Sequence, residues 1–409
     1  MEFLLVLFAC TVLAVIVARP AILRHLRRRD FERAAASSPR PPLGPEASGD
    51  RPVSFRKEGA DGDAGPGRVT EGGLVPVENL DRRLPGPDDE LIEALEETQR
   101  TQDWRPAGQL LALTDDVELR WQRVQSLAGA AAMELARWQA AQGSAGPDEQ
   151  PPGAPEATGV PGGAPGAPVS DAGWLREWRR EQPADAGGAQ VYAQFLVWQA
   201  LSDPGSAGHR IILEEARTVC REAAGLAADD PTPLITELMV ARVLGDGRPE
   251  FEALWQRVVR LAPDHMGAHL AALPYWSEKW HGSRKEAYAF AESAAAGAAP
   301  GSLLPALPLF AVYDHLPEVT FAEGVYRGKV TTDAIEAAHY ALLHARPGHP
   351  VLPHVHHLLL FFLVRAERYP EAAEQVRAVD GYVGALPWVN SEDPARQYAA
   401  YRALAIGGQ

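Results

Sequence analysis

Histidines are the first side chains of this sequence whose spacing could support metal chemistry, since six of the 12 fall between positions 339 and 357. On a helix, His354 and His357 would share a face, and a carboxylate from elsewhere could complete a metal site. The chain has no His-Glu-x-x-His motif, and the five-residue spacing of His339 and His344 would splay them on a helix. The alternative is structural, with His344 near one helix C-terminus and His354 in the first turn of the next helix. We therefore predict no cofactor and keep His354 and His357 as the positions to test for a metal.

Other motifs that could carry catalysis are incomplete. Residues 324–331 resemble a phosphate-binding loop, but the glycines are one residue too close and Val330 follows Lys329 where Ser or Thr is required. Cys220 lies in an alanine-rich helical stretch and is expected to pack in the core rather than act as a nucleophile. The sequence contains no Gly-x-Ser-x-Gly elbow, kinase signature or dinucleotide fingerprint. We predict no catalytic residue.

The most distinctive segment of the chain contains Trp276, Lys279, Trp280 and His281. The two tryptophans are four residues apart and would share one face of a helix. Aromatic and cationic side chains dominate binding hot spots, so these four residues form a candidate surface for a partner that carries an acidic group. The alternative is that both tryptophans pack between neighbouring helix hairpins while Lys279 extends its ammonium group to solvent.

The residues that follow predict a corner between two helices. Gly282 is placed where a helix ends, and we expect it to adopt the left-handed conformation found there. Ser283 and Glu286 are three residues apart, which is the spacing of a capping box at the start of the next helix.

Helices must position all of these side chains, because apolar residues recur at helical spacing and we find no convincing run of alternating strand residues. Asp88 or Asp89 is expected to begin one helix, and Asp115 with Glu118 resembles a capping box for another. Near the C-terminus the pattern predicts a helix hairpin over 352–366 and 371–379. The fold class is all-α.

A repeat is visible in the second half of the chain. Residues 226–229 (LAAD) align with residues 261–264 (LAPD) at an offset of 35, and similar breaks follow at 299–301 and 346–348. Two helical patterns follow each break. A period of about 34 residues with two helices per unit is typical of tetratricopeptide repeats. We therefore predict a helix-hairpin solenoid over residues 171–409.

The repeat units resemble tetratricopeptide repeats in a degenerate form, because the small-residue positions of that motif are only partly filled. In addition, residues 275–283 (YWSEKWHGS), followed by 288–291 (YAFA) and 299–302 (APGS), resemble an uncharacterised bacterial family, domain of unknown function 4034. This similarity would cover roughly residues 88–400. It implies no chemistry that could be assigned to individual residues.

The N-terminus predicts a membrane anchor. Residues 3–18 contain no charge and span roughly 24 Å as a helix, and extending the segment to residue 23 approaches the thickness of a bilayer core. A cleaved signal peptide is the alternative, but the segment lacks a basic N-terminal flank and a good cleavage site. Arginines gather after the segment, so a single-pass protein of the cell membrane is expected, with its bulk in the cytoplasm.

Two segments rich in proline and glycine divide the rest of the chain. Residues 34–87 hold nine prolines and nine glycines, and residues 143–170 hold seven of each. Neither can bury enough apolar surface to offset the entropy of ordering. The predicted organisation is listed here in chain order: an anchor (1–23), a basic juxtamembrane segment and disordered linker (24–87), a small helical block (88–142), a second linker (143–170) and the repeat domain (171–409).

Composition narrows the possible functions. The 409 residues carry a net charge of -15, which argues against nucleic-acid binding. Solenoids expose surfaces suited to extended partners, so a membrane-anchored scaffold that binds a protein or peptide is the leading hypothesis. The alternatives are an enzyme or a small-ligand sensor with a histidine- or tryptophan-lined site in the helical domain.

Overall fold

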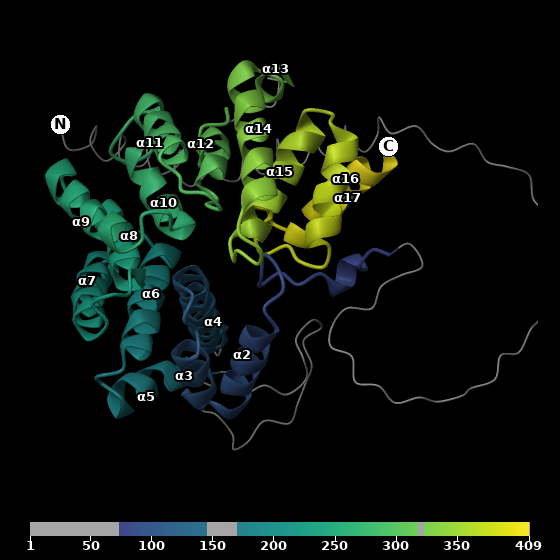
Figure 1. The fold of residues 1–409 in the computed structure, drawn as a ribbon. Helices are drawn as coiled ribbons and strands as arrows, with labels where there is room; N and C mark the ends of the chain where they lie inside the picture. The colour runs from purple at the N-terminus through teal and green to yellow at the C-terminus, as the bar shows by residue number, and fades with distance from the viewer. Residues whose placement is uncertain (1–72, 145–169, 318–322, 409) are drawn as a thin grey trace, which may run out of the picture. The chain divides into compact units, whose positions relative to one another are not determined.

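The computed structural model describes residues 73–144, 170–317 and 323–408. Within these ranges the chain forms sixteen α-helices, four short 3-10 helices and no β-strand, which confirms the predicted all-α class (Figure 1). None of the described helices is both long enough and apolar enough to cross a bilayer. The predicted anchor, most of the first linker and nearly all of the second lie outside the described residues.

The helices belong to two compact units. The short helix α13 (Glu323–Tyr326) falls in one, and every other described helix falls in the other, which holds residues 68–315 and 327–409. The helices of this larger unit are α2 (Asp89–Thr101), α3 (Arg105–Ala112), α4 (Val117–Ser144), α5 (Gly173–Glu181), α6 (Ala186–Ser202), α7 (His209–Leu226), α8 (Thr232–Leu244), α9 (Arg248–Leu261), α10 (Met266–Ala272), α11 (Arg284–Ala296), α12 (Leu307–Asp314), α14 (Lys329–His344), α15 (Leu352–Arg365), α16 (Tyr369–Val379) and α17 (Pro394–Gly407). The 3-10 helices are η1 (Val77–Asn79), η2 (Leu273–Trp276), η3 (Leu304–Ala306) and η4 (Trp388–Asn390).

Local sequence signals set many of the helix boundaries. Asp88 is the N-cap of α2, and its Oδ1 accepts a hydrogen bond from the N–H of Leu91 at 3.1 Å. The four repeated breaks seen in the sequence all lie between helices, after α7, α9, α11 and α14. The hairpin predicted near the C-terminus is present as α15 and α16.

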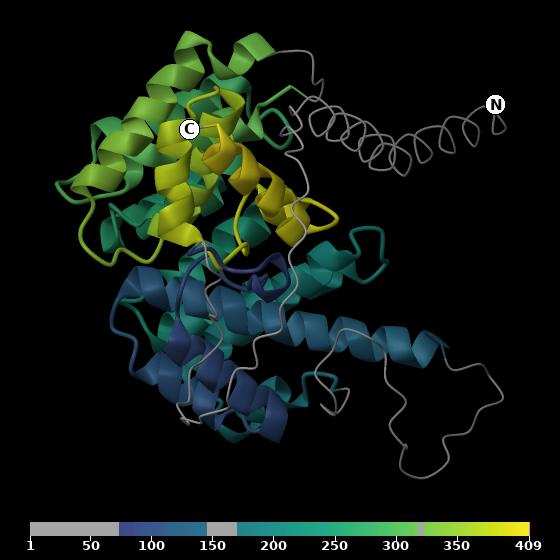
Figure 2. The ribbon, with the colours of Figure 1, turned by 90° about the vertical axis from the view of Figure 1, so that its right-hand side faces the viewer.

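The long helix α4 packs along one side of a row formed by α6, α8 and α10 (Figure 1). Helix α7 packs on α6 and α8, and α9 packs on α8. Gln125 of α4 donates to the side-chain oxygen of Gln194 on α6 at 2.7 Å. Gly267 of α10 lies against the ring of Trp121, and a Cβ atom there would come within 2.6 Å of it. The helical block of residues 88–142 is therefore packed into the same unit as the helices that follow, and Figure 2 shows α4 crossing this unit.

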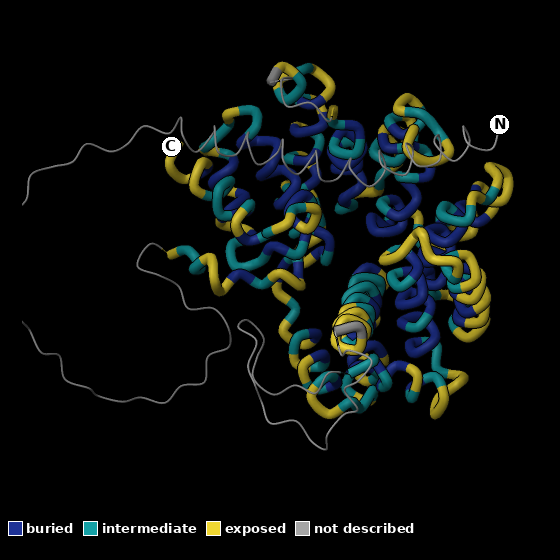
Figure 3. Tube along the Cα trace, turned by 180° about the vertical axis from the view of Figure 1, so that it is seen from behind, coloured by how far each residue is buried: buried dark blue, intermediate teal, exposed yellow. Residues whose placement is uncertain are grey.

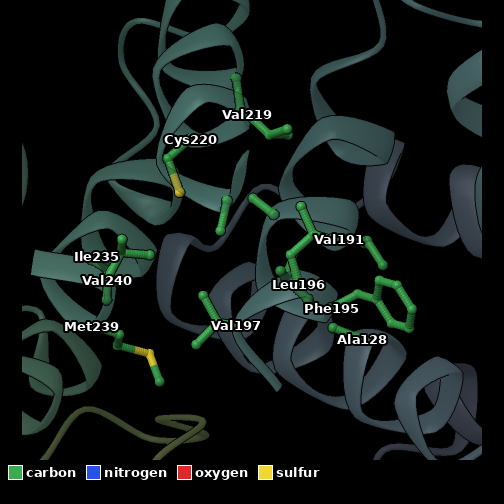
Figure 4. Close-up of a cluster of buried hydrophobic side chains, with 14 of the residues drawn as sticks. Ala128, Val191, Phe195, Leu196, Val197, Val219, Cys220, Ile235, Met239 and Val240 are labelled. Carbon is green, nitrogen blue, oxygen red and sulfur yellow. The ribbon is translucent and has the colours of Figure 1, made fainter. Parts of the chain in front are cut away.

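The main core lies between these helices. Figure 3 shows buried residues on the sides of helices that face one another and exposed residues on the outer turns. Cys220 of α7 is fully buried among Val219, Ile235 and other apolar side chains, as expected from its sequence context (Figure 4). Burial raises the pKa of the Cys220 thiol, so the thiol stays protonated at neutral pH.

Residues 74–85 pack against the C-terminal helices, which corrects the predicted end of the first linker. The N–H of Asp81 donates to the carbonyl oxygen of Gly381 at 2.8 Å, and the N–H of Val383 donates back to the carbonyl oxygen of Asp81 at 2.8 Å. Leu80 and Leu84 are buried. The proline and glycine content suggested a linker here, but backbone hydrogen bonds that join Asp81 and Leu84 to residues 381–384 hold this stretch against the C-terminal part of the chain.

Candidate functional site

The segment that contains the two tryptophans is not a continuous helix. The 3-10 helix η2 ends at Trp276, and residues 277–282 form turns, so Trp276 and Trp280 do not share a helix face as the spacing had suggested. Gly282 is required here for a different reason from the one expected. Its φ is not in the left-handed region, but a Cβ atom would overlap the carbonyl group of Trp276. Close backbone approach therefore selects glycine at this corner.

Trp276 joins two helices. Its ring stacks on Phe290 of α11 and meets Phe251 of α9 edge-on, each at a centroid distance of 6.0 Å. The guanidinium of Arg248 lies 5.0 Å from the ring centroid of Trp276. Trp276 thus packs between adjacent helices, as the structural alternative proposed.

Trp280 differs, because 41% of its surface is exposed. The guanidinium of Arg242, near the end of α8, lies 4.9 Å from its ring centroid. His281 donates from Nε2 to the carbonyl oxygen of Arg242 at 2.8 Å, which fixes the turn against α8. Burial lowers the pKa of Arg242 to about 10, so its guanidinium stays charged at neutral pH.

Lys279 is bonded within the chain. Its Nζ donates to the carbonyl oxygen of Asp314 at 2.7 Å and to Oδ1 of the same residue at 3.0 Å. The structure therefore brings Trp276, Lys279, Trp280 and His281 to one corner, but Trp280 alone of these four both exposes a large ring and has no hydrogen bond from its side chain to a described residue.

Ser283 is the N-cap of α11. Its Oγ accepts from the N–H of Glu286 at 3.3 Å and donates to Oε2 of Glu286 at 2.9 Å. Hydrogen bonds from Arg248 and Ser283 hold the pKa of Glu286 below its usual value. These contacts give Ser283 and Glu286 a structural role.

A charged cleft that sequence reasoning missed lies beside this corner, between α7, α8 and α9. Its volume is about 370 Å³. Arg217 donates from Nη2 to both carboxylate oxygens of Asp246, at 2.8 and 2.9 Å, and Arg221 donates from Nε to Glu237 at 2.9 Å. Arg257 and Glu250 also line the cleft, and neither has a hydrogen bond or ion pair with any described residue.

The cleft continues past Arg257 into a hollow of about 200 Å³. Here Arg257 and Arg260 border an apolar floor made by Ala228, Leu234 and Leu261. The only sequence signal for the pair of hollows was the recurrence of arginine at spacings of three and four, which is also the pattern of an ordinary solvated helix face.

Of the two candidate metal ligands, His357 is engaged through both ring nitrogens. His357 donates from Nε2 to the carbonyl oxygen of Pro85 at 2.9 Å, and its Nδ1 accepts from the indole of Trp388 at 3.0 Å. Burial lowers the pKa of His354 to about 4 and that of His357 to about 3. Among the described residues, no group of three or more His, Cys, Asp or Glu side chains is arranged to hold a metal ion.

Glu118, in the first turn of α4, is a deeply buried carboxyl group. It does not complete the capping box expected with Asp115. Instead, Oδ1 of Asp116 accepts from the N–H groups of Glu118 and Leu119 at 2.9 and 3.0 Å, and the Glu118 side chain reaches α10. Its oxygens accept from the N–H groups of Met266 and Gly267. Glu118 therefore fastens α4 to α10.

Comparisons of this chain with protein-family models, with curated proteins and with solved structures find no match. The resemblance to tetratricopeptide repeats and to domain of unknown function 4034 stays a prediction.

Proposed function

We propose that this protein is a helical-repeat scaffold that binds a segment of a partner protein in the cleft between α7, α8 and α9. The cleft carries the proposal, because it combines a volume of about 370 Å³ with a charged side chain, Arg257, that has no partner among the described residues. Charged groups that are aimed into a cleft and left unpaired suit a ligand of complementary charge.

The position of α4 supports this choice of surface. In a solenoid, the row of first helices of each hairpin is the expected place for an extended partner. Here α4 packs on α6, α8 and α10, so the chain itself covers that side of the row. The cleft on α7 and α9 remains open.

We further propose that residues 3–23 anchor the scaffold in the cell membrane as a single span and leave the helical unit in the cytoplasm. The support is the uncharged run of residues 3–18 and the arginines that follow it. A reporter enzyme fused after residue 409 is expected to be active in the cytoplasm. Activity of that fusion outside the membrane would contradict the proposed orientation.

Site-specific photocrosslinking in the native host tests the binding function. The full-length chain carries a photoreactive amino acid in place of Ala253, which lines the cleft, or in place of Ala289, an exposed residue of α11 that serves as the matched control. We expect discrete products from position 253 that are lost in the Arg257→Glu variant and are not formed from position 289. Identical products from both positions, or none from position 253, would refute the proposal.

A further inference from the structure

The two hollows adjoin at Arg257, which lines both, so together they have a polar end and an apolar end. At the polar end, Arg221 donates only from its Nε to Glu237, and the rest of its guanidinium has no hydrogen bond to a described residue. With Arg257, it offers two sets of guanidinium donors in one cleft. Guanidinium groups bind carboxylates strongly, and in paired geometry when both N–H groups are available.

Glu237 lines the same cleft. Only 5% of its surface is exposed, its Oε1 accepts from Arg221, and its Oε2 has no hydrogen-bond donor among the described residues. Because Oε2 has almost no accessible surface, Glu237 orients Arg221 from the wall of the cleft and does not itself contact a ligand.

The charges that line the polar end favour a carboxylate over a phosphate as the bound anion. Glu237 and Asp246 already lie in the cleft opposite Arg221 and Arg217, and Glu250 lines it together with Arg257. A doubly charged phosphate would face three carboxylates, whereas a singly charged carboxylate meets less repulsion. At the other end, Leu234 and Leu261 offer a floor for an apolar side chain.

We propose that this surface binds an extended peptide in which an acidic residue stands next to an apolar residue. The acidic side chain pairs with Arg257 and Arg221, and the apolar side chain covers Leu234 and Leu261. This inference rests on the proposed binding function and names the chemistry of the partner segment.

Fluorescence anisotropy with the full-length chain in detergent tests the inference. Three labelled nonapeptides, identical apart from a central pair, carry Glu-Leu, Gln-Leu or Glu-Ser. We expect the Glu-Leu peptide to bind at least about tenfold more tightly than either of the others, since a lost ionic or apolar contact typically changes affinity by that factor. The preference for Glu over Gln should disappear in Arg257→Ala, and the preference for Leu over Ser should disappear in Leu261→Ser.

Arg210→Ala is the matched control, because Arg210 is an exposed arginine of α7 that pairs with Glu214 and does not line either hollow. This variant should bind all three peptides as the unchanged protein does. Equal affinity for the three peptides, or an unchanged preference in Arg257→Ala, would overturn the inference. If crosslinking from position 253 still depends on Arg257 in that case, the binding function stands and only the peptide chemistry is wrong. A crosslinked dimer of this chain would assign the surface to self-association and overturn both.

Discussion

The side chain of Glu118 lies 3.2 Å from Nδ1 of His265, a nitrogen that already accepts a hydrogen bond from the N–H of Ala268 at 3.1 Å. The other ring nitrogen of His265 faces the carbonyl oxygen of Val117 at 3.3 Å and must donate to it. Nδ1 therefore carries no proton, so Nδ1 and an ionised Glu118 are two acceptors that repel at this distance. The contact becomes favourable when Glu118 carries a proton and donates it to His265.

The free energy of unfolding should depend on pH through Glu118. Only 4% of this residue is exposed, and burial raises its pKa to about 7. A folded-state pKa above the ordinary value stabilises the fold fully below about pH 4.5, and this contribution is lost as pH rises through 7. We expect the free energy of unfolding of Glu118→Gln, relative to that of the unchanged protein, to rise by about 2.5 kcal/mol between pH 5 and pH 8.

Denaturant unfolding of both proteins across pH 5–8.5 measures this difference. Other titratable groups near Glu118 are Asp116, Arg346 and His349, and they are common to both proteins, so they cancel. The amide of glutamine can donate to His265 and accept from Met266, but its nitrogen cannot accept from the N–H of Gly267, and this loss is the same at every pH. A difference that does not grow with pH would show that Glu118 is ionised in the folded protein throughout this range.

Replacing His357 should destabilise the C-terminal helices. In His357→Ala, the carbonyl oxygen of Pro85 and the indole N–H of Trp388 lose their partner inside the core. We expect the free energy of unfolding to fall by about 2 kcal/mol or more. His344→Ala is the control, since His344 is exposed, and its effect should stay within about 0.5 kcal/mol. Equal effects of the two substitutions would contradict the buried hydrogen bonds.

The purified protein without substitutions should contain less than one equivalent of zinc or iron by elemental analysis. Both ring nitrogens of His357 already form hydrogen bonds, to Pro85 and Trp388. One equivalent of metal that is lost in His354→Ala would overturn this expectation and favour the enzyme alternative.

Gly282→Ala should be among the more damaging single changes in the chain. The added Cβ would overlap the backbone of Trp276, so the corner between η2 and α11 would have to open. We expect a loss of more than about 2 kcal/mol, measured by thermal or denaturant unfolding. Gly225→Ala, in α7, is the control because its Cβ would meet open space, and alanine favours a helix by up to about 1 kcal/mol. A neutral Gly282→Ala would mean that this corner is more open than the structure shows.

Lys279→Ala should leave both stability and partner crosslinking nearly unchanged. The Lys279 side chain is 59% exposed and bonds to Asp314, and exposed ion pairs contribute about 1 kcal/mol or less. Crosslinking from position 253 should persist, since Lys279 does not line the cleft. Loss of crosslinking without loss of stability would instead place Lys279 on the binding surface.

Local patterns in the sequence were enough to predict the helices. Asp88 and Ser283 cap helices as expected, and the repeated breaks fall between helices, because these features depend on neighbours within a few residues. The placement of Trp276 and Trp280 was wrong for the same reason. Their spacing matched a helix, but the turn at residues 277–282 depends on contacts with α8 and α12 that lie far away in the sequence.

The cleft could not have been predicted from spacing alone. Arg217 and Arg257 come from different helices, and they line the same cleft only because α7 and α9 both pack on α8. Likewise, Glu118 matched a local cap, yet its partners are 148 and 149 residues away. Tertiary packing decides which of the possible local bonds forms.

The pairing of residues 74–85 with the C-terminal helices has a consequence for how the unit unfolds. Repeat arrays with free ends can fray from one end, because each unit contacts only its neighbours. Here the N–H of Val75 donates to Asp380 at 2.6 Å, and Arg402 bonds to both residues. Neither end can detach without breaking contacts with the other. Loss of α17 through a premature stop codon should therefore release residues 74–85 as well, and the shortened chain would become a substrate for proteases along much of its length.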